Sequence, residues 1–147
     1  MSLTSAQNAT LKAAMLVDAN VIAIVGQDQH VADYYNSAST TAIWLPNLPR
    51  ATIIASTNWV AFAAKTALLQ ATFTALLLDG TVDATNANIR NGFGAVFSGA
   101  DLTALSSVAQ RTATKLEALF SSGGPPAVTT LFNHVLTDVE VNTARNS

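Results

Sequence analysis

The chain has 147 residues, of which half are apolar and 11% are charged; it has no cysteine, two histidines and a net charge of −2. Soluble domains normally carry about a quarter of their residues as charged side chains, so this composition predicts a building block that hides much of its surface against other proteins or copies of itself. The seven lysines and arginines lie singly along the chain, which argues against binding of a nucleic-acid phosphate backbone. The absence of cysteine excludes a disulfide scaffold and a thiolate zinc site.

The N-terminal third predicts two short helices followed by an extended segment. Thr4 or Ser5 can cap the first helix, and a second helix begins near Asp28. Residues 37–48 are polar and then apolar before a proline, which is typical of an extended or looped arm. Trp44 is the large apolar residue that would anchor this arm.

Residues 59–78 are long enough to span a membrane, but their pattern favours a buried helix. Lys65 and Gln70 interrupt the apolar run, and a lysine near the centre of a span costs roughly 2.5–3.5 kcal/mol. The large side chains follow steps of three and four residues and therefore share one face; they are Trp59, Phe62, Leu69, Phe73 and Leu76. We expect a helix at a core or a subunit interface, with a possible restart at Thr66.

The second half of the chain predicts two further helices. Asp83 or Thr85 opens the first of them, and Asp101 opens the most regular helix of the chain, which continues through Phe120. The Gly-Gly-Pro-Pro sequence at 123–126 ends that helix.

The C-terminus carries a capping box, in which Thr137 and Glu140 start a short helix over 138–145. The whole pattern predicts a mainly α fold in a single domain. Its bundle-like helical part covers 1–122, and a C-terminal arm covers 123–147.

No residue set in the sequence predicts an active site, a metal site or a cofactor site. His30 and His134 each lack a second ligand at metal spacing. The glycines of 92–94 lack the third glycine of a dinucleotide loop and indicate close helix packing instead. Residues 79–83 match only a fragment of a calcium loop, and a turn between helices is the simpler interpretation.

Six motifs in a fixed order carry a resemblance to a known family: AIW at 42–44, NW at 58–59, DATNANIRNG at 83–92, FSGA at 97–100, RTATKLEALF at 111–120 and LTDVEVNTARNS at 136–147. Together they resemble a group of small proteins encoded in the structural modules of tailed bacteriophages and prophages. The resemblance covers roughly residues 25–147, and its motifs are packing and capping signatures. The chain departs from the family in its Ala- and Thr-rich central helix and in Pro125-Pro126.

The family's genes lie near the portal and capsid genes, so the resemblance implies a virion protein that is made in the host cytoplasm. It implies a head–tail connector or adaptor, a ring of twelve copies in the neck that binds the portal protein and a tail or nozzle protein. We expect no enzymatic activity, no cofactor, no sequence-specific nucleic-acid binding and no membrane association. The alternatives are a capsid-decorating or tail-terminating protein, a small membrane protein such as a holin, and a small hydrolase.

The expected interface residues are apolar side chains of the two predicted arms. In the first arm the expected contact residue is Trp44. We expect the second arm to dock on a neighbouring subunit or on the portal through Phe132, Val135, Leu136 and Val139. The competing interpretation is that the C-terminal segment folds back and completes the core of its own subunit.

Overall fold

The computed structural model describes residues 2–24 and 26–147. These residues are 56% helical, with ten helices and three small two-stranded sheets, so the fold is α+β rather than purely α. The sheets pair β1 with β4, β2 with β3, and β5 with β6. In chain order the elements are α1 (Ser5–Val17), α2 (Ala19–Ile22), α3 (Asp28–Asn36), β1 (Ala38–Trp44), β2 (Leu48–Pro49), α4 (Arg50–Ser56), α5 (Trp59–Ala63), α6 (Ala67–Leu76), β3 (Thr81–Val82), α7 (Ala87–Val96), α8 (Gly99–Val108), β4 (Gln110–Thr114), α9 (Lys115–Leu119), β5 (Ser121–Ser122), β6 (Val128–Thr129) and α10 (Asp138–Arg145).

The chain forms two compact units. The first contains the residues up to Thr41 together with 112–123 and 129–147, and the second contains 42–111 and 124–128. The expected separate arm over 123–147 is therefore divided, and most of it belongs to the first unit.

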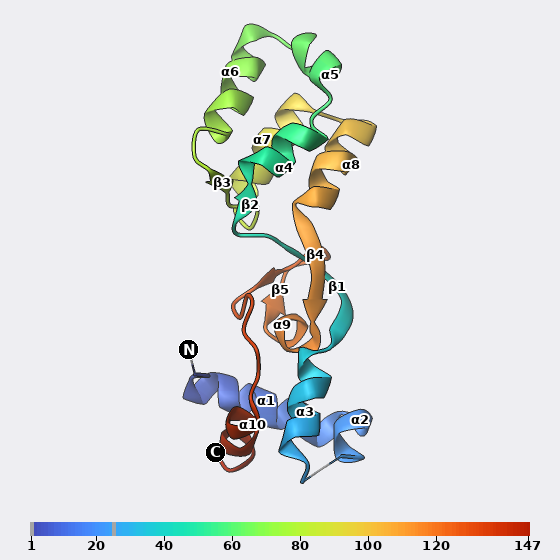
Figure 1. The fold of residues 1–147 in the computed structure, drawn as a ribbon, viewed down its shortest axis with the longest axis vertical. Helices are drawn as coiled ribbons and strands as arrows, with labels where there is room; N and C mark the ends of the chain where they lie inside the picture. The colour runs from blue at the N-terminus through green and yellow to red at the C-terminus, as the bar shows by residue number, and fades with distance from the viewer. Residues whose placement is uncertain (1, 25) are drawn as a thin grey trace. The chain divides into compact units, whose positions relative to one another are not determined.

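The first unit is built from α1, α3, α9 and α10, and its helices contact one another along their apolar faces (Figure 1). Thr4 caps α1, one of the two predicted candidates, and it does so in a capping box with Gln7. The predicted box of Thr137 and Glu140 starts α10. The core combines residues that are far apart in the chain; its most buried members include Leu11, Val31, Tyr35, Leu116, Leu136 and Val141.

Hydrogen bonds of a half-buried asparagine and a buried glutamate hold the C-terminal segment in this unit. The side-chain amide of Asn36 donates to the Leu136 carbonyl and accepts from the Leu136 N–H, both at 2.8 Å. The Glu117 carboxylate, only 1% exposed, accepts from the N–H groups of Thr114 and Asn133, both at 2.8 Å. The Asn36 bonds thus join segments a hundred residues apart, and the Glu117 bonds join α9 to the segment before α10.

The second unit has an aromatic core. The rings of Phe73 and Phe97 lie 5.1 Å apart edge to face, and Phe62 and Phe93 contact Phe73. The expected helix over 59–78 is two helices, because Thr66 caps α6 as a new start. None of the helices among the described residues is both long enough and apolar enough to span a membrane.

Close packing between α6 and α7 depends on Gly92. A Cβ placed at this glycine would lie 2.8 Å from Leu76 Cδ1. The sequence-based interpretation of the Gly-Phe-Gly motif as a packing feature is therefore confirmed at Gly92, whereas Gly94 has more room, with Leu102 Cδ2 at 4.0 Å.

The long helix expected from Asp101 to Phe120 is wrong. In its place, α8 ends at Val108, β4 follows, and α9 begins at Lys115. The reason is a third capping box, in which Thr114 and Glu117 exchange side-chain and backbone hydrogen bonds and start a new helix.

Two smaller helix boundaries also differ from the sequence-based expectation. Asn86, and not Asp83 or Thr85, caps α7. Residues 79–83, expected as a turn between helices, contain β3, which pairs antiparallel with β2. Asp83 instead accepts hydrogen bonds from the backbone N–H and hydroxyl of Thr85, so its carboxylate is used within the turn.

Candidate functional site

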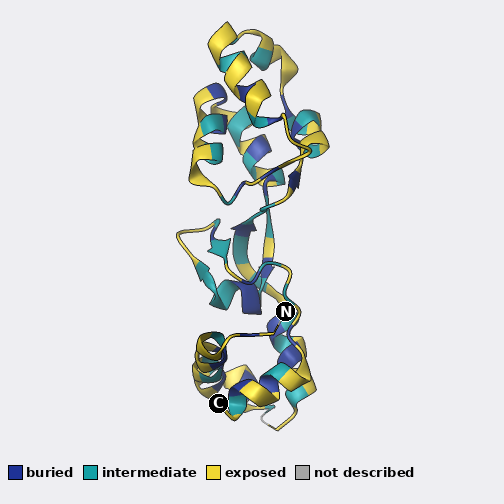
Figure 2. Ribbon diagram, turned by 90° about the vertical axis from the view of Figure 1, so that its left-hand side faces the viewer, coloured by how far each residue is buried: buried dark blue, intermediate teal, exposed yellow. Residues whose placement is uncertain are grey.

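Large apolar side chains are exposed on both units. Nine of them among the described residues are about half exposed or more: Leu16, Val17, Ile22, Trp59, Val60, Leu68, Leu78, Val135 and Val139. Many helices in Figure 2 show exposed segments beside buried ones. Because exposed apolar surface beyond scattered single residues marks interaction sites, these positions are the first candidates for a functional surface.

The expected interface residues fall into three environments. Val135 and Val139 are exposed, at 70% and 68%. Leu136 is 2% exposed and belongs to the core of its own unit. Phe132 and Trp44 are half-buried. Only the two valines are thus available in full to another molecule, and their interface role stays a prediction.

Trp44 packs within the second unit. The Arg90 guanidinium lies 4.9 Å from the centre of its ring, and the backbone N–H of Trp44 donates to the Ala127 carbonyl at 2.9 Å. A tryptophan held in this way anchors its own unit.

We call Val135, Asp138 and Val139 the α10 knob. Asp138 is exposed, and one of its carboxylate oxygens accepts from the Val139 N–H at 2.8 Å. The knob therefore presents two apolar side chains and a negative charge at the start of α10. Val135 and Val139 also line an open hollow of about 440 Å³, together with Asn133, His134 and Glu140.

His134 and Glu140 form a pair that serves the fold. The His134 Nε2 atom lies 3.1 Å from a Glu140 oxygen, and the same carboxylate accepts from the N–H groups of Leu3 at 3.2 Å and Thr137 at 3.1 Å. The printed contacts of the His134 ring are with Glu140, whose carboxylate also caps α10.

A second surface of the first unit is an open groove of about 390 Å³, which we call the α1–α9 groove. Helices α1, α3 and α9 contribute most of its walls. The residues that line it are Ala14, Val17, Asp18, Tyr35, Ser39, Lys115, Ala118 and Leu119.

The two charged residues of the groove are held by neighbouring side chains. Asp18 accepts from the Tyr34 hydroxyl at 2.8 Å and from the Asn20 N–H at 2.9 Å. Desolvation raises the pKa of Asp18, but these hydrogen bonds outweigh it and leave the pKa below its usual value. The Lys115 ammonium donates to the Ser37 hydroxyl at 2.6 Å and lies 4.2 Å from the centre of the Tyr34 ring.

Tyr35 lines the groove, but its hydroxyl is buried away from the surface. Tyr35 is 4% exposed, and its hydroxyl has no hydrogen-bond partner among the described residues. Burial raises the pKa of Tyr35 to about 12, and the nearby charges of Asp18 and Tyr34 add to the effect. The phenol is therefore a neutral O–H donor that lacks an acceptor, which costs about 1–3 kcal/mol in a buried site.

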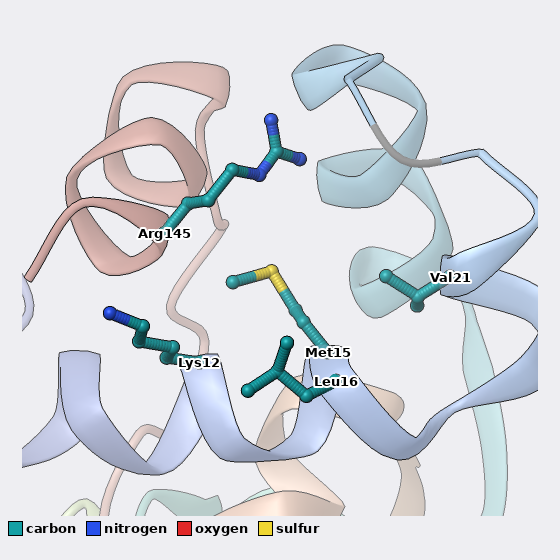
Figure 3. Close-up of a pocket in the computed structure, with 5 residues that line it drawn as sticks. All are labelled: Lys12, Met15, Leu16, Val21 and Arg145. Carbon is teal, nitrogen blue, oxygen red and sulfur yellow. The ribbon is translucent and has the colours of Figure 1, made fainter.

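A smaller pocket of about 100 Å³ lies between α1 and α10 in the same unit (Figure 3). Lys12 and Arg145 border it, together with Met15, Leu16 and Val21. Both cations already have partners, because Arg145 pairs with Asp28 and Lys12 donates to the Ser147 carbonyl. The pocket is therefore a poor site for an anion.

The second unit exposes apolar side chains on and beside α5 and α6. Val60, Leu68 and Leu78 are 84%, 76% and 75% exposed. Trp59 is 48% exposed and donates its ring N–H to the Ile54 carbonyl at 3.1 Å, which fixes the ring at the surface. This surface offers apolar contact with few polar groups.

Among the described residues, no three His, Cys, Asp or Glu side chains lie close enough to hold a metal ion. No protein family, curated protein or solved structure matches the chain. The sequence predicted Val135 and Val139 as interface residues, but it did not predict the groove, because the groove's walls come from three separate segments. The capping signal of Thr114 and Glu117 places Lys115 at the start of a helix and could have indicated the α9 wall.

Proposed function

We propose that this chain is a structural protein of a tailed-phage particle, a head–tail connector or adaptor that forms a ring between the portal and the tail. The observation that carries the proposal is the exposure of large apolar side chains on both units of a chain with few charges. Exposed apolar patches are typical of surfaces that other proteins cover. The resemblance of the sequence motifs to those of the phage family is the reason for proposing a phage particle.

The proposed role is mechanical. The first unit offers the α10 knob and the α1–α9 groove, and the second offers the apolar surface of α5 and α6, so one copy has separate surfaces for neighbouring copies and for other ring proteins. The portal protein and a tail or nozzle protein are the proposed partners, with twelve copies to match the portal ring. The proposal assigns no catalytic residue and no cofactor.

Copy number in the particle tests the proposal. Quantitative mass spectrometry of purified virions should find about one copy of this chain per copy of the portal protein. A capsid-scale excess, hundreds of copies per virion, would replace the connector with a capsid-decorating protein. Complete absence of the chain from purified virions would reject both structural roles.

A tail-terminating protein is the second candidate, because the same exposed apolar surfaces suit a ring at the end of a tail tube. The protein content of heads that lack tails distinguishes a connector from a terminator. A connector remains on DNA-filled heads that lack tails, whereas a terminator is found on isolated tails.

A further inference from the structure

We propose that α10 is exchanged between copies: in the assembled ring, the α10 of each copy packs on α1 and α3 of the next copy, in the place that it fills within a single chain. The inference rests on the proposed function for the assembly of copies into a ring. The partner is a second copy of this chain, because the site already fits this helix.

The site for α10 is built by residues far from it in the sequence. The helix packs mainly on α3 and α1, and its inner side chains Val141 and Ala144 are fully buried in the core that these helices share. At the edge of the contact, the Asn142 side chain donates to the Asp28 carboxylate at 3.1 Å, and Arg145 pairs with the same carboxylate. Every copy carries this site on its N-terminal helices, so the α10 of another copy can make the same contacts.

A short irregular connector leads into α10. We define it as residues 132–135, which form neither helix nor strand and lie between the buried side chains of Leu131 and Leu136. Asn133 in the connector has a φ of 57°, which is uncommon for a residue other than glycine. Strain in a short connection favours exchange of the element that follows it. The capping box that starts α10 lies beyond the connector and moves with the helix.

The connector and the first turn of α10 expose apolar side chains. Val135 is 70% exposed and Val139 is 68% exposed, and both border an open hollow of about 440 Å³. Four residues span at most about 14 Å, so exchange requires two first units to meet around the connector. Their meeting would cover the two valines, which a single chain leaves in contact with water.

The exchange is directional. A copy that donates its α10 to one neighbour and accepts an α10 from the other uses two different parts of its first unit. Such a head-to-tail contact repeats around a closed ring, as the proposed connector requires. A reciprocal exchange between two copies would instead produce a dimer.

Cysteine cross-linking tests the exchange, because the native chain has no cysteine. A full-length chain with both Asp28→Cys and Asn142→Cys should form a disulfide within one chain in dilute purified protein. In oxidised assembled particles the same chain should form a ladder of covalent multimers. The matched controls are chains with Asp28→Cys alone or Asn142→Cys alone, which should give no ladder.

Two results would overturn the exchange. One is a disulfide that stays within single chains in the assembled particles, which places each α10 on its own copy. The other is a ladder that stops at the dimer, which indicates a reciprocal pair and no ring. Copy number in the virion is measured separately, so a failed exchange and a failed connector role are distinguishable.

Mixing of two charge variants gives a check that does not depend on disulfide geometry. Asp28→Arg places two guanidinium groups at the contact and Arg145→Asp places two carboxylates there, so each variant alone should assemble about tenfold less than the native chain. With exchange, an equimolar mixture brings opposite charges together and should recover most of the assembly. The chain with both substitutions should assemble like the native chain, which controls for folding. No recovery in the mixture would contradict the exchange.

Discussion

The two units are stabilised in different ways. The first brings together three separated stretches of chain and joins them by part-buried hydrogen bonds, such as those of Asn36 and Glu117. The second is almost one continuous stretch, packed around the rings of Phe73 and Phe97 with two others. The stability of the first unit therefore depends on the presence of every segment, whereas the stability of the second depends on a few large aromatic side chains.

The difference also separates the surfaces. In the first unit the exposed apolar residues lie beside charged and hydrogen-bonding groups, as Val17 lies beside Asp18 and Lys115. In the second, Val60 and Leu68 lie on short helices with few charges. A contact with directional hydrogen bonds specifies a partner more narrowly than apolar contact alone, so we assign the specific contact between copies to the first unit.

Truncation after Gly124 should have the largest effect. It removes Leu136 and Val141 from the core of the first unit, and it deprives Asn36 of Leu136 and Glu117 of Asn133. The losses exceed the usual stability of a domain, about 5–15 kcal/mol, so we expect the first unit to unfold. Circular dichroism and proteolysis of the truncated chain measure this; a first unit that stays folded would mean that the C-terminal segment is a detachable arm.

Phe73→Ala should destabilise the second unit by about 3–5 kcal/mol, because it leaves a cavity at the centre of the aromatic cluster. Thermal or denaturant unfolding monitored by circular dichroism measures the change. The matched control is Leu78→Ala, a large apolar residue that is 75% exposed and should cost little. Equal effects from both substitutions would contradict the core assignment.

Capping signals in the sequence predicted the helix ends more reliably than the spacing of apolar residues did. Thr137 and Glu140 gave the last helix correctly, and Thr66 gave the restart after α5. The error at 101–120 arose because apolar residues at steps of three and four continue across β4 by coincidence. The capping box at Thr114 marks the break, and it outweighs the periodicity because it satisfies N–H groups at a helix start.

The candidate site could be predicted only in part. Val135 and Val139 are exposed, as an interface requires. Leu136, which lies between them in the sequence, is buried in the core of the first unit. The groove could not be predicted, since Val17, Tyr35 and Lys115 meet only after the chain has crossed the unit several times. Such long-range contacts have no local sequence signature.

Asn36→Ala should destabilise the first unit by about 1–3 kcal/mol, because the Leu136 N–H and C=O both lose their partner in a part-buried site. Chemical denaturation of the full chain measures the loss. Asn142→Ala removes a more exposed bond to Asp28 and should cost much less. If the two variants unfold alike, the Asn36 bonds contribute less than their geometry implies.

High pH should weaken the first unit through Tyr35. Burial and the nearby negative charges raise the pKa of its phenol to about 12, so the folded state holds the proton more tightly than the unfolded state does. The stabilisation is complete below the unfolded pKa of about 10 and is lost as the pH rises toward about 12. Urea denaturation across this range should show a smaller loss in Tyr35→Phe than in the native chain; identical pH profiles would contradict the burial of the hydroxyl.

The smallest effects should distinguish two glycines of α7. Gly94→Ala should stabilise the second unit by about 0.5–1 kcal/mol through helix propensity, since its nearest contact leaves room for a methyl group. Gly92→Ala should stabilise the second unit less than Gly94→Ala or destabilise it slightly, because the new Cβ requires the Leu76 side chain to move. Paired melting curves measure both, and equal gains would mean that α6 and α7 do not pack closely at Gly92.

The location of the chain in a particle tests the central claim most directly. A low-resolution image of tailed virions, with this chain marked by a C-terminal tag or a bound antibody, should place the label at the junction of head and tail. A label over the capsid surface or along the tail, or no label on the particle, would contradict the connector role.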